Sequence, residues 1–169
     1  MGRRAGVSHN APYKHFKSKQ DLLAAIASRE LDGQSRAVGA AASKTGRPIE
    51  KLRRLMHGYI RWACAYPRRF QLTFGPWTHQ SQELEAAASR SRARLIDLAH
   101  TAQRAGELPA GNPERIAYLM LSLAHGAVDL ALAGHLSVKG KGAADPEMLI
   151  DDLFSLLRPN ARRAERSPP

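Results

Sequence analysis

The spacing of apolar residues constrains the fold of this chain more than any other feature. Apolar side chains recur at intervals of three and four residues along most of the sequence, and the strict alternation typical of strands is absent. Glycine and proline interrupt the pattern where helices begin or end. The sequence therefore predicts an all-α protein with helices over residues 18–42, 48–66, 67–74, 81–105, 112–136 and 145–157.

The last two helices have strong start signals and a very apolar composition. Asn112-Pro113-Glu114 and Asp145-Pro146-Glu147 each supply a capping side chain, a first-turn proline and an acid favoured by the helix dipole. The earlier helix is apolar almost all round from Ile116 to Leu132, so a small bundle cannot cover it alone. We expect two copies of the chain to pair as a homodimer through a four-helix interface. The residues predicted at that interface are Leu123, Ala127, Leu153 and Phe154.

The N-terminal segment has the pattern of a helix-turn-helix. Gly6 allows a tight turn because glycine adopts positive φ values without steric cost. Ser8 can cap a short second helix, and Ser18 with Asp21 forms a variant of the capping box that opens the next one. In this motif the second helix enters the major groove of DNA. Five basic residues precede Asp21, the first acidic residue, which favours the same partner.

The short second helix carries the candidate DNA contacts. Polar side chains at its start can bond to base edges, and Asn10 in particular can pair with adenine through two hydrogen bonds. The later residues suit phosphate contacts, which orient the protein without specifying sequence. Tyr13 and Phe16 can instead be core residues, and for Phe16 we favour that interpretation. The predicted DNA-binding residues are Ser8, His9, Asn10, Tyr13, Lys14, His15 and Lys19.

Two groups of motifs resemble a known family. Gly6-Val7-Ser8, Tyr13-x-His15-Phe16 and Lys19-x-Asp21-Leu22-Leu23 are similar to the DNA-binding signature of TetR-type bacterial transcriptional regulators. Members of that family have a complete first helix before the turn, whereas only Met1 to Arg4 precede it here, so we expect a curtailed helix-turn-helix. Further motifs resemble the ligand-binding half of regulators with a WHG-type C-terminal domain, although Leu121 stands where the tryptophan is expected. They are Tyr59-Ile60-Arg61-Trp62-Ala63, Tyr66-Pro67, Phe70-x-Leu72-x-Phe74-Gly75 and His125-Gly126.

The resemblance implies a division of the chain and a function. Residues 1–44 would hold the helix-turn-helix, which lacks its first helix, and the connecting helix. Residues 45–158 would form an effector-binding and dimerisation domain, and residues 159–169 a disordered basic tail. The implied protein is a ligand-responsive repressor that a small apolar effector releases from its double-stranded operator. The alternative is a helical dimerisation protein without specific DNA binding that acts through a full-length partner.

Half of the chain's aromatic residues form a group that begins at Tyr59 and ends at Trp77. Such a group forms either plain core or an apolar pocket with a few polar groups for orientation. His57, His100 and His125 are the candidate polar groups. The functional interpretation predicts binding of an apolar or aromatic small molecule. The predicted effector-binding residues are Tyr59, Trp62, Phe74, Trp77 and His125.

Composition and motifs disfavour other classes of function. The net charge of +11 favours a polyanionic partner, and no apolar run approaches the ~20 residues of a membrane span. Cys64 is the only cysteine and the N-terminus lacks an apolar leader, so we expect a cytoplasmic protein. No catalytic or cofactor motif is present, although an enzyme that uses the aromatic pocket stays as an alternative. His125 and Asp129 have metal-ligand spacing but no third ligand, so we expect no metal or cofactor.

Overall fold

The computed structural model describes residues 15–43, 45–77 and 81–159, and this part of the chain contains helices and no strand. An isolated bridge joins Ser137 with Gly142 in the loop between the last two helices. The all-α prediction is confirmed. The helices are α1 (Lys19–Ala42), α2 (Pro48–Ala65), α3 (Pro67–Phe74), α4 (Gln82–Arg104), α5 (Pro113–Leu132) and α6 (Pro146–Leu156).

The sequence signals for helix starts are confirmed by side-chain hydrogen bonds. Ser18 Oγ accepts from the Asp21 amide at 3.1 Å and opens α1. Asn112 Oδ1 accepts from the amides of Glu114 and Arg115 at 2.8 and 3.3 Å, and Asp145 caps α6 in the same way. These bonds satisfy amides that have no partner within the helix.

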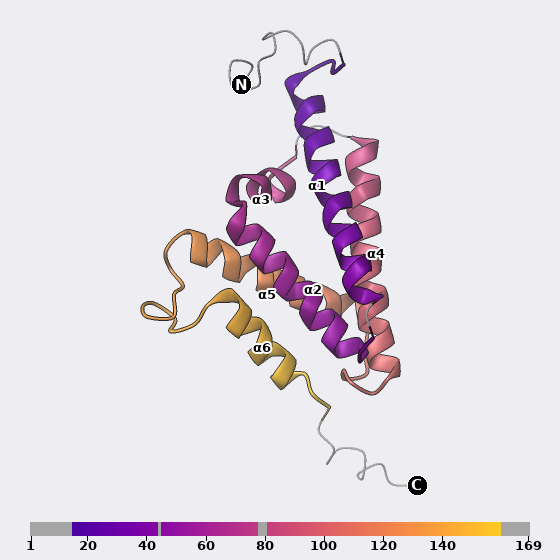
Figure 1. Ribbon diagram of the computed structural model, residues 1–169, viewed down its shortest axis with the longest axis vertical. Coiled ribbons are helices and arrows are strands. Elements are labelled where there is room, and N and C mark those ends of the chain that lie inside the picture. The colour runs from indigo at the N-terminus through magenta and orange to yellow at the C-terminus, as the bar shows by residue number, and fades with distance from the viewer. Residues whose placement is uncertain (1–14, 44, 78–80, 160–169) are drawn as a thin grey trace.

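The helices pack in two groups. α1 and α4 lie side by side, while α2 crosses them and contacts α5 and α6 (Figure 1). The main core is formed by α2 to α6, and its largest fully buried side chains are Phe70, Phe154, Leu52, Met120, Ile150 and Val128. α1 contributes to a separate, smaller cluster with α4, which contains Ala24, Ala27, Leu31, Leu84 and Ala87. The first helix is therefore attached outside the main core.

The end of α5 differs from the sequence prediction. The helix ends at Leu132, four residues before the predicted end at Leu136. Gly134 adopts φ +73, a left-handed conformation in which the chain turns away from the helix. Leu136 then folds back and packs with Ala127 and Ala144 in a small cluster of its own. Periodicity alone did not show this reversal because Leu136 still fits the helical pattern.

Two of the residues predicted at the dimer interface are covered within the single chain. Ala127 and Phe154 are each only 2% exposed, because Ala127 packs under the α5–α6 loop and Phe154 packs in the main core. Leu123 and Leu153 are partly buried and pack at the edge of that core. The large apolar residues of α5 and α6 that remain exposed are others, namely Tyr118, Leu119, Leu130, Leu132, Met148 and Leu156.

α5 also corrects the expectation that no segment reaches the length of a membrane span. Pro113–Leu132 has 20 residues and a mean hydropathy of 1.3 over its most apolar window, so it is long and apolar enough by these two measures. Core helices of proteins outside membranes meet the same criterion. Here α5 packs against α2, α4 and α6, yet only 28% of that window is buried. An apolar face of α5 therefore stays uncovered in the single chain.

Candidate ligand-binding site

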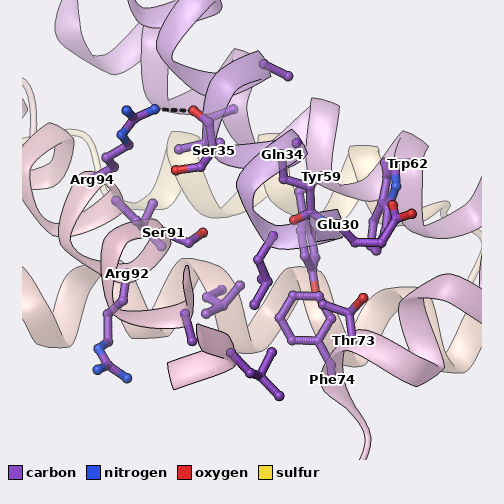
Figure 2. Close-up of a pocket in the computed structure, with 18 of the residues that line it drawn as sticks. Glu30, Gln34, Ser35, Tyr59, Trp62, Thr73, Phe74, Ser91, Arg92 and Arg94 are labelled. Carbon is purple, nitrogen blue, oxygen red and sulfur yellow. Dashed lines mark hydrogen bonds between the residues drawn. The ribbon is translucent and has the colours of Figure 1, made fainter. Parts of the chain in front are cut away.

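A cavity of about 1370 Å³ lies between α1, α2 and α4, with α3 and α5 contributing to its wall (Figure 2). This volume exceeds the roughly 300–1,000 Å³ that is usual for small-molecule sites. Leu31, Leu55, Leu95 and Leu121 provide aliphatic surface from four different helices. The cavity therefore offers a large apolar space whose walls come from both packing groups.

Four of the five predicted effector-binding residues line this cavity. They are Tyr59, Trp62, Phe74 and Trp77, so the aromatic group forms a wall and not only core. The core interpretation also holds in part, because Phe70 is 1% exposed and packs edge-on against Tyr59 and Trp62. Whether these side chains contact an effector stays a prediction.

His125 lies behind the wall of the cavity. Its Nδ1 is 2.8 Å from the hydroxyl oxygen of Tyr59, and its ring centroid is 4.7 Å from that of Phe70. Its Nε2 lies 3.6 Å from the carboxylate of Asp129. A proton on Nε2 suits that carboxylate and leaves Nδ1 to accept from Tyr59. His125 therefore orients the Tyr59 ring, which itself lines the cavity.

The environment of Tyr59 keeps its hydroxyl protonated. Burial, and secondly the negative charge of Asp129, raise the pKa of Tyr59 well above its usual value. A protonated hydroxyl is a donor, which matches its bond to His125. The hydrogen bond to His125 therefore orients Tyr59.

The other two candidate histidines lie elsewhere. His57 on α2 lies between two carboxylates of α6, with Nδ1 at 3.1 Å from Glu147 and Nε2 at 2.9 Å from Asp151. His100 is exposed on α4 and does not line the large cavity. His57 therefore joins two helices, and only His125 belongs to the aromatic group.

The polar residues of the cavity wall that the sequence analysis missed include Gln34, Arg54 and Thr73. Each has a covered nitrogen or oxygen without a hydrogen-bond partner among the described residues, namely Gln34 Nε2, Arg54 Nε and Nη2, and Thr73 Oγ1. Leaving a buried donor unpaired costs about 1–3 kcal/mol. Gln34 was missed because α1 was assigned to the DNA-binding part, and no motif marked Arg54 on α2 or Thr73 on α3.

Polar contacts tie α1 to its neighbours around the cavity. Glu30 pairs with Arg69 of α3 at 3.3 Å, and Asp32 pairs with Arg90 of α4 at 2.8 Å. Arg94 of α4 donates to the Ser35 carbonyl (Figure 2). These contacts hold the middle of α1 beside the cavity through partly exposed groups.

Most of the predicted DNA-binding residues lie outside the described residues. These are Ser8, His9, Asn10, Tyr13 and Lys14. His15 and Lys19 are described and exposed; Lys19 is the first residue of α1, and His15 lies four residues before it. Their role in DNA binding stays a prediction.

The geometry gives no support to the enzyme alternative. Partial burial, followed by the charges of Glu147 and Asp145, raises the pKa of the Cys64 thiol, which disfavours the reactive thiolate. His57 pairs with carboxylates of α6. Within the described ranges, no group of three histidine, cysteine, aspartate or glutamate residues is arranged to hold a metal ion.

Comparisons with known proteins place this geometry in a family. A family model described as "Tetracyclin repressor-like, C-terminal domain" matches residues 52–157, more than half of the chain. Comparison with the curated proteins gave no match.

Solved structures share the fold. A protein of unknown function from Rhodococcus sp. RHA1 is 26% identical with a TM-score of 0.76, and the match covers 92% of this chain and 79% of that one. The TetR family transcriptional regulator PfmR from Thermus thermophilus is 20% identical with a TM-score of 0.70, covering 93% and 84%. SmeT, the repressor of the Stenotrophomonas maltophilia multidrug efflux pump SmeDEF, is 21% identical with a TM-score of 0.66, covering 95% and 79%.

The raised pKa of Tyr59 predicts a pH-dependent loss of stability. Below pH 10 the tyrosine is protonated in both states, so its contribution to stability is complete. Above about pH 10 the unfolded chain ionises there while the folded chain does not, so stability falls as pH rises toward the folded pKa. We expect the wild type to lose about 1.4 kcal/mol more than Tyr59→Phe between pH 9 and pH 11.

Urea unfolding followed by circular dichroism at several pH values measures this difference. Tyr66→Phe is the matched control, because Tyr66 is 49% exposed. Parallel pH profiles for the wild type and Tyr59→Phe would contradict the prediction.

Proposed function

The chain belongs to the tetracyclin repressor-like family of transcriptional regulators, and from this premise we propose that it is a ligand-responsive DNA-binding repressor. In this proposal a small apolar or aromatic molecule binds in the cavity and releases the protein from its operator. The observation that carries the proposal is the position of α1. This helix follows directly after the segment that the sequence predicts to be a helix-turn-helix, and it also forms one wall of the cavity.

The proposed mechanism is a shift between two conformations. A ligand that fills the cavity contacts α1, α2 and α4 together, so it favours one spacing between α1 and the main core. In a dimer, α1 sets the separation of two recognition helices, which must match major-groove sites ~34 Å apart. Ligand and operator then weaken each other's binding by the same factor.

We assign the regions of the chain as predicted from the sequence. Residues 1–44 bind DNA and connect to the core, residues 45–158 bind the effector and dimerise, and residues 159–169 form a basic tail. A dimer of this kind works in the cytoplasm on double-stranded DNA. The apolar face of α5 left uncovered in one chain supports the homodimer.

Leu119 and Leu130 locate the proposed dimer face. Both are about half exposed on α5 and lie eleven residues apart, which is about three helical turns and places them on one side. Leu123 and Gly126 lie between them on the same side, and a Cβ at Gly126 would meet no atom within 4 Å. Two copies of α5 can therefore approach closely along this line.

The first prediction from the proposal concerns DNA. Lys19→Ala removes an exposed charge at the start of α1, so binding to a mixed-sequence duplex should weaken and the salt dependence should decrease by about one unit of slope. Lys139→Ala removes the same charge from the exposed α5–α6 loop and should leave binding unchanged. Fluorescence anisotropy over a salt series measures both. Equal effects of the two variants, or no binding at all, would favour the dimerisation protein without specific DNA binding.

The second prediction tests the link between ligand and DNA. Compounds with naphthalene or decyl bodies that bind the wild type should raise its melting temperature by mass action and change the fluorescence of Trp62 and Trp77, the only two tryptophans. The same compounds should weaken DNA binding. Gly58→Phe places a ring toward the cavity and should abolish these effects, because a Cβ at Gly58 meets no atom within 4 Å and the helix tolerates it.

Gly58→Ala is the matched control, since its methyl group leaves the cavity open. Ligand effects that persist in Gly58→Phe would place the binding site elsewhere. Binding without any change in DNA affinity would refute the responsive mechanism.

The third prediction concerns the dimer. Leu119→Glu puts a charge in the proposed apolar face and should convert the dimer to monomer in analytical ultracentrifugation. Ala105→Glu, at an exposed position after α4, should remain dimeric. A wild-type protein that sediments as a monomer at micromolar concentration would show that the face is not a dimer interface.

A further inference from the structure

Resting on the proposed function, we propose that the molecule bound in the cavity is an organic acid, and that Arg54 binds its carboxylate. The acid would have an apolar body, aliphatic or aromatic, and one carboxylate end. A ligand with the same apolar body but no carboxylate would then bind more weakly.

The guanidinium of Arg54 carries the first observation. Its Nε and Nη2 atoms are covered and have no hydrogen-bond partner among the described residues, although Arg54 lines the cavity. These two N–H groups lie on one edge of the guanidinium, the edge that binds a carboxylate through two parallel hydrogen bonds. The unpaired Nε and Nη2 atoms thus form a bidentate hydrogen-bond donor.

The remaining charged side chains of the cavity wall have partners. Glu30 pairs with Arg69, and Glu85 pairs with Arg92 at 3.7 Å. Arg94 donates to a backbone carbonyl of α1. Within the described part of the wall, Arg54 is therefore the charged residue for which no partner is seen, and an anion would supply one.

Glu50 is the nearest competitor for Arg54. It lies one turn earlier on α2, and its Oε2 and Arg54 Nη2 are 3.1 and 3.2 Å from the point where a Cβ on Gly46 would stand. No ion pair within 4.0 Å joins the two side chains in the described structure, and Glu50 is exposed. Gly46, at φ +136, leaves the space beside the guanidinium free of a side chain.

Two further donors agree with a ligand that carries hydrogen-bond acceptors. Gln34 Nε2 comes from α1 and Thr73 Oγ1 from α3, and both are covered and unpaired in the described structure. Figure 2 labels Gln34 and Thr73 among the residues that line the cavity, together with Tyr59 and Phe74. A ligand with acceptor oxygens can pair such donors after small side-chain rotations, whereas a hydrocarbon leaves their cost in place.

Matched acids and amides test the proposal. The probes are 2-naphthoic acid with 2-naphthamide, and decanoic acid with decanamide, titrated against the full chain by tryptophan fluorescence and calorimetry at pH 7.5. Each pair has the same apolar body, and only the acid is charged. We expect each acid to bind at least about tenfold more tightly than its amide, because charge-assisted hydrogen bonds are the stronger ones.

Variants assign the preference to Arg54. Arg54→Met should reduce the acid-to-amide ratio to about threefold or less and leave amide binding unchanged, which also shows that the variant is folded. Arg54→Lys keeps the positive charge but cannot form the bidentate hydrogen bond, so it should retain only part of the acid-to-amide affinity ratio. Arg61→Met, at a position 64% exposed, is the matched control and should keep the full ratio. Glu50→Gln should not lower it.

The outcomes separate this inference from the proposed function. Equal affinity for acids and amides in the wild type overturns the inference but leaves ligand binding in the cavity intact. A full ratio retained in Arg54→Met also overturns it, since another group would then hold the carboxylate. If neither acids nor amides bind, both the inference and the ligand-responsive function fail.

Discussion

The rest of the structure depends on how α1 is attached to α4. At its N-terminal half the contact is close and apolar, because Ala24 and Ala27 let the helix approach Leu84 and Ala87. Further along, side chains of α4 reach across to α1: Arg90 to Asp32 and Arg94 to the Ser35 carbonyl. The glycine at position 39 permits this reach, since a Cβ there would stand 2.9 Å from Arg94 Nη1. Small alanines therefore hold α1 close to α4 at one end, and long arginines hold the two helices further apart at the other. The cavity lies in the space that this difference leaves between them.

This mode of attachment leaves α1 outside the main core. No residue of α1 belongs to the main core, whose members come from α2 to α6 and from the loop between α4 and α5. Partly exposed ion pairs such as Asp32–Arg90 contribute at most about 1 kcal/mol each. A shift of α1 would disturb its contacts with α2, α3 and α4 and the small apolar cluster, whereas the main core contains no residue of α1. A ligand can supply the free energy of that shift through its differential affinity for the two positions of α1.

The sequence predicted most of the fold because local signals dominate in helices. Capping residues such as Asn112, and prolines at the first turn, placed the helix starts within one residue. The sequence prediction failed where packing between distant residues sets the helix end. Leu136 lies beyond the end of α5 and packs over Ala127. The aromatic half of the cavity was predictable, since Tyr59, Trp62 and Phe74 are close in sequence. Gln34 and Arg54 were not, because they reach the cavity from helices that meet only in the folded chain.

α5 brings the two proposed activities of the protein into contact. Its Ala117, Tyr118 and Leu121 line the cavity, while Leu119 and Leu130 belong to the uncovered outer face. Tyr118 is 41% exposed as well as cavity-lining, so it lies where the two surfaces meet. A ligand in contact with Tyr118 would therefore touch the helix that we propose pairs with a second chain, and the same helix forms one wall of the cavity. Because the cavity and the proposed dimer face share α5, ligand affinity and dimerisation each have to be measured with the other held constant.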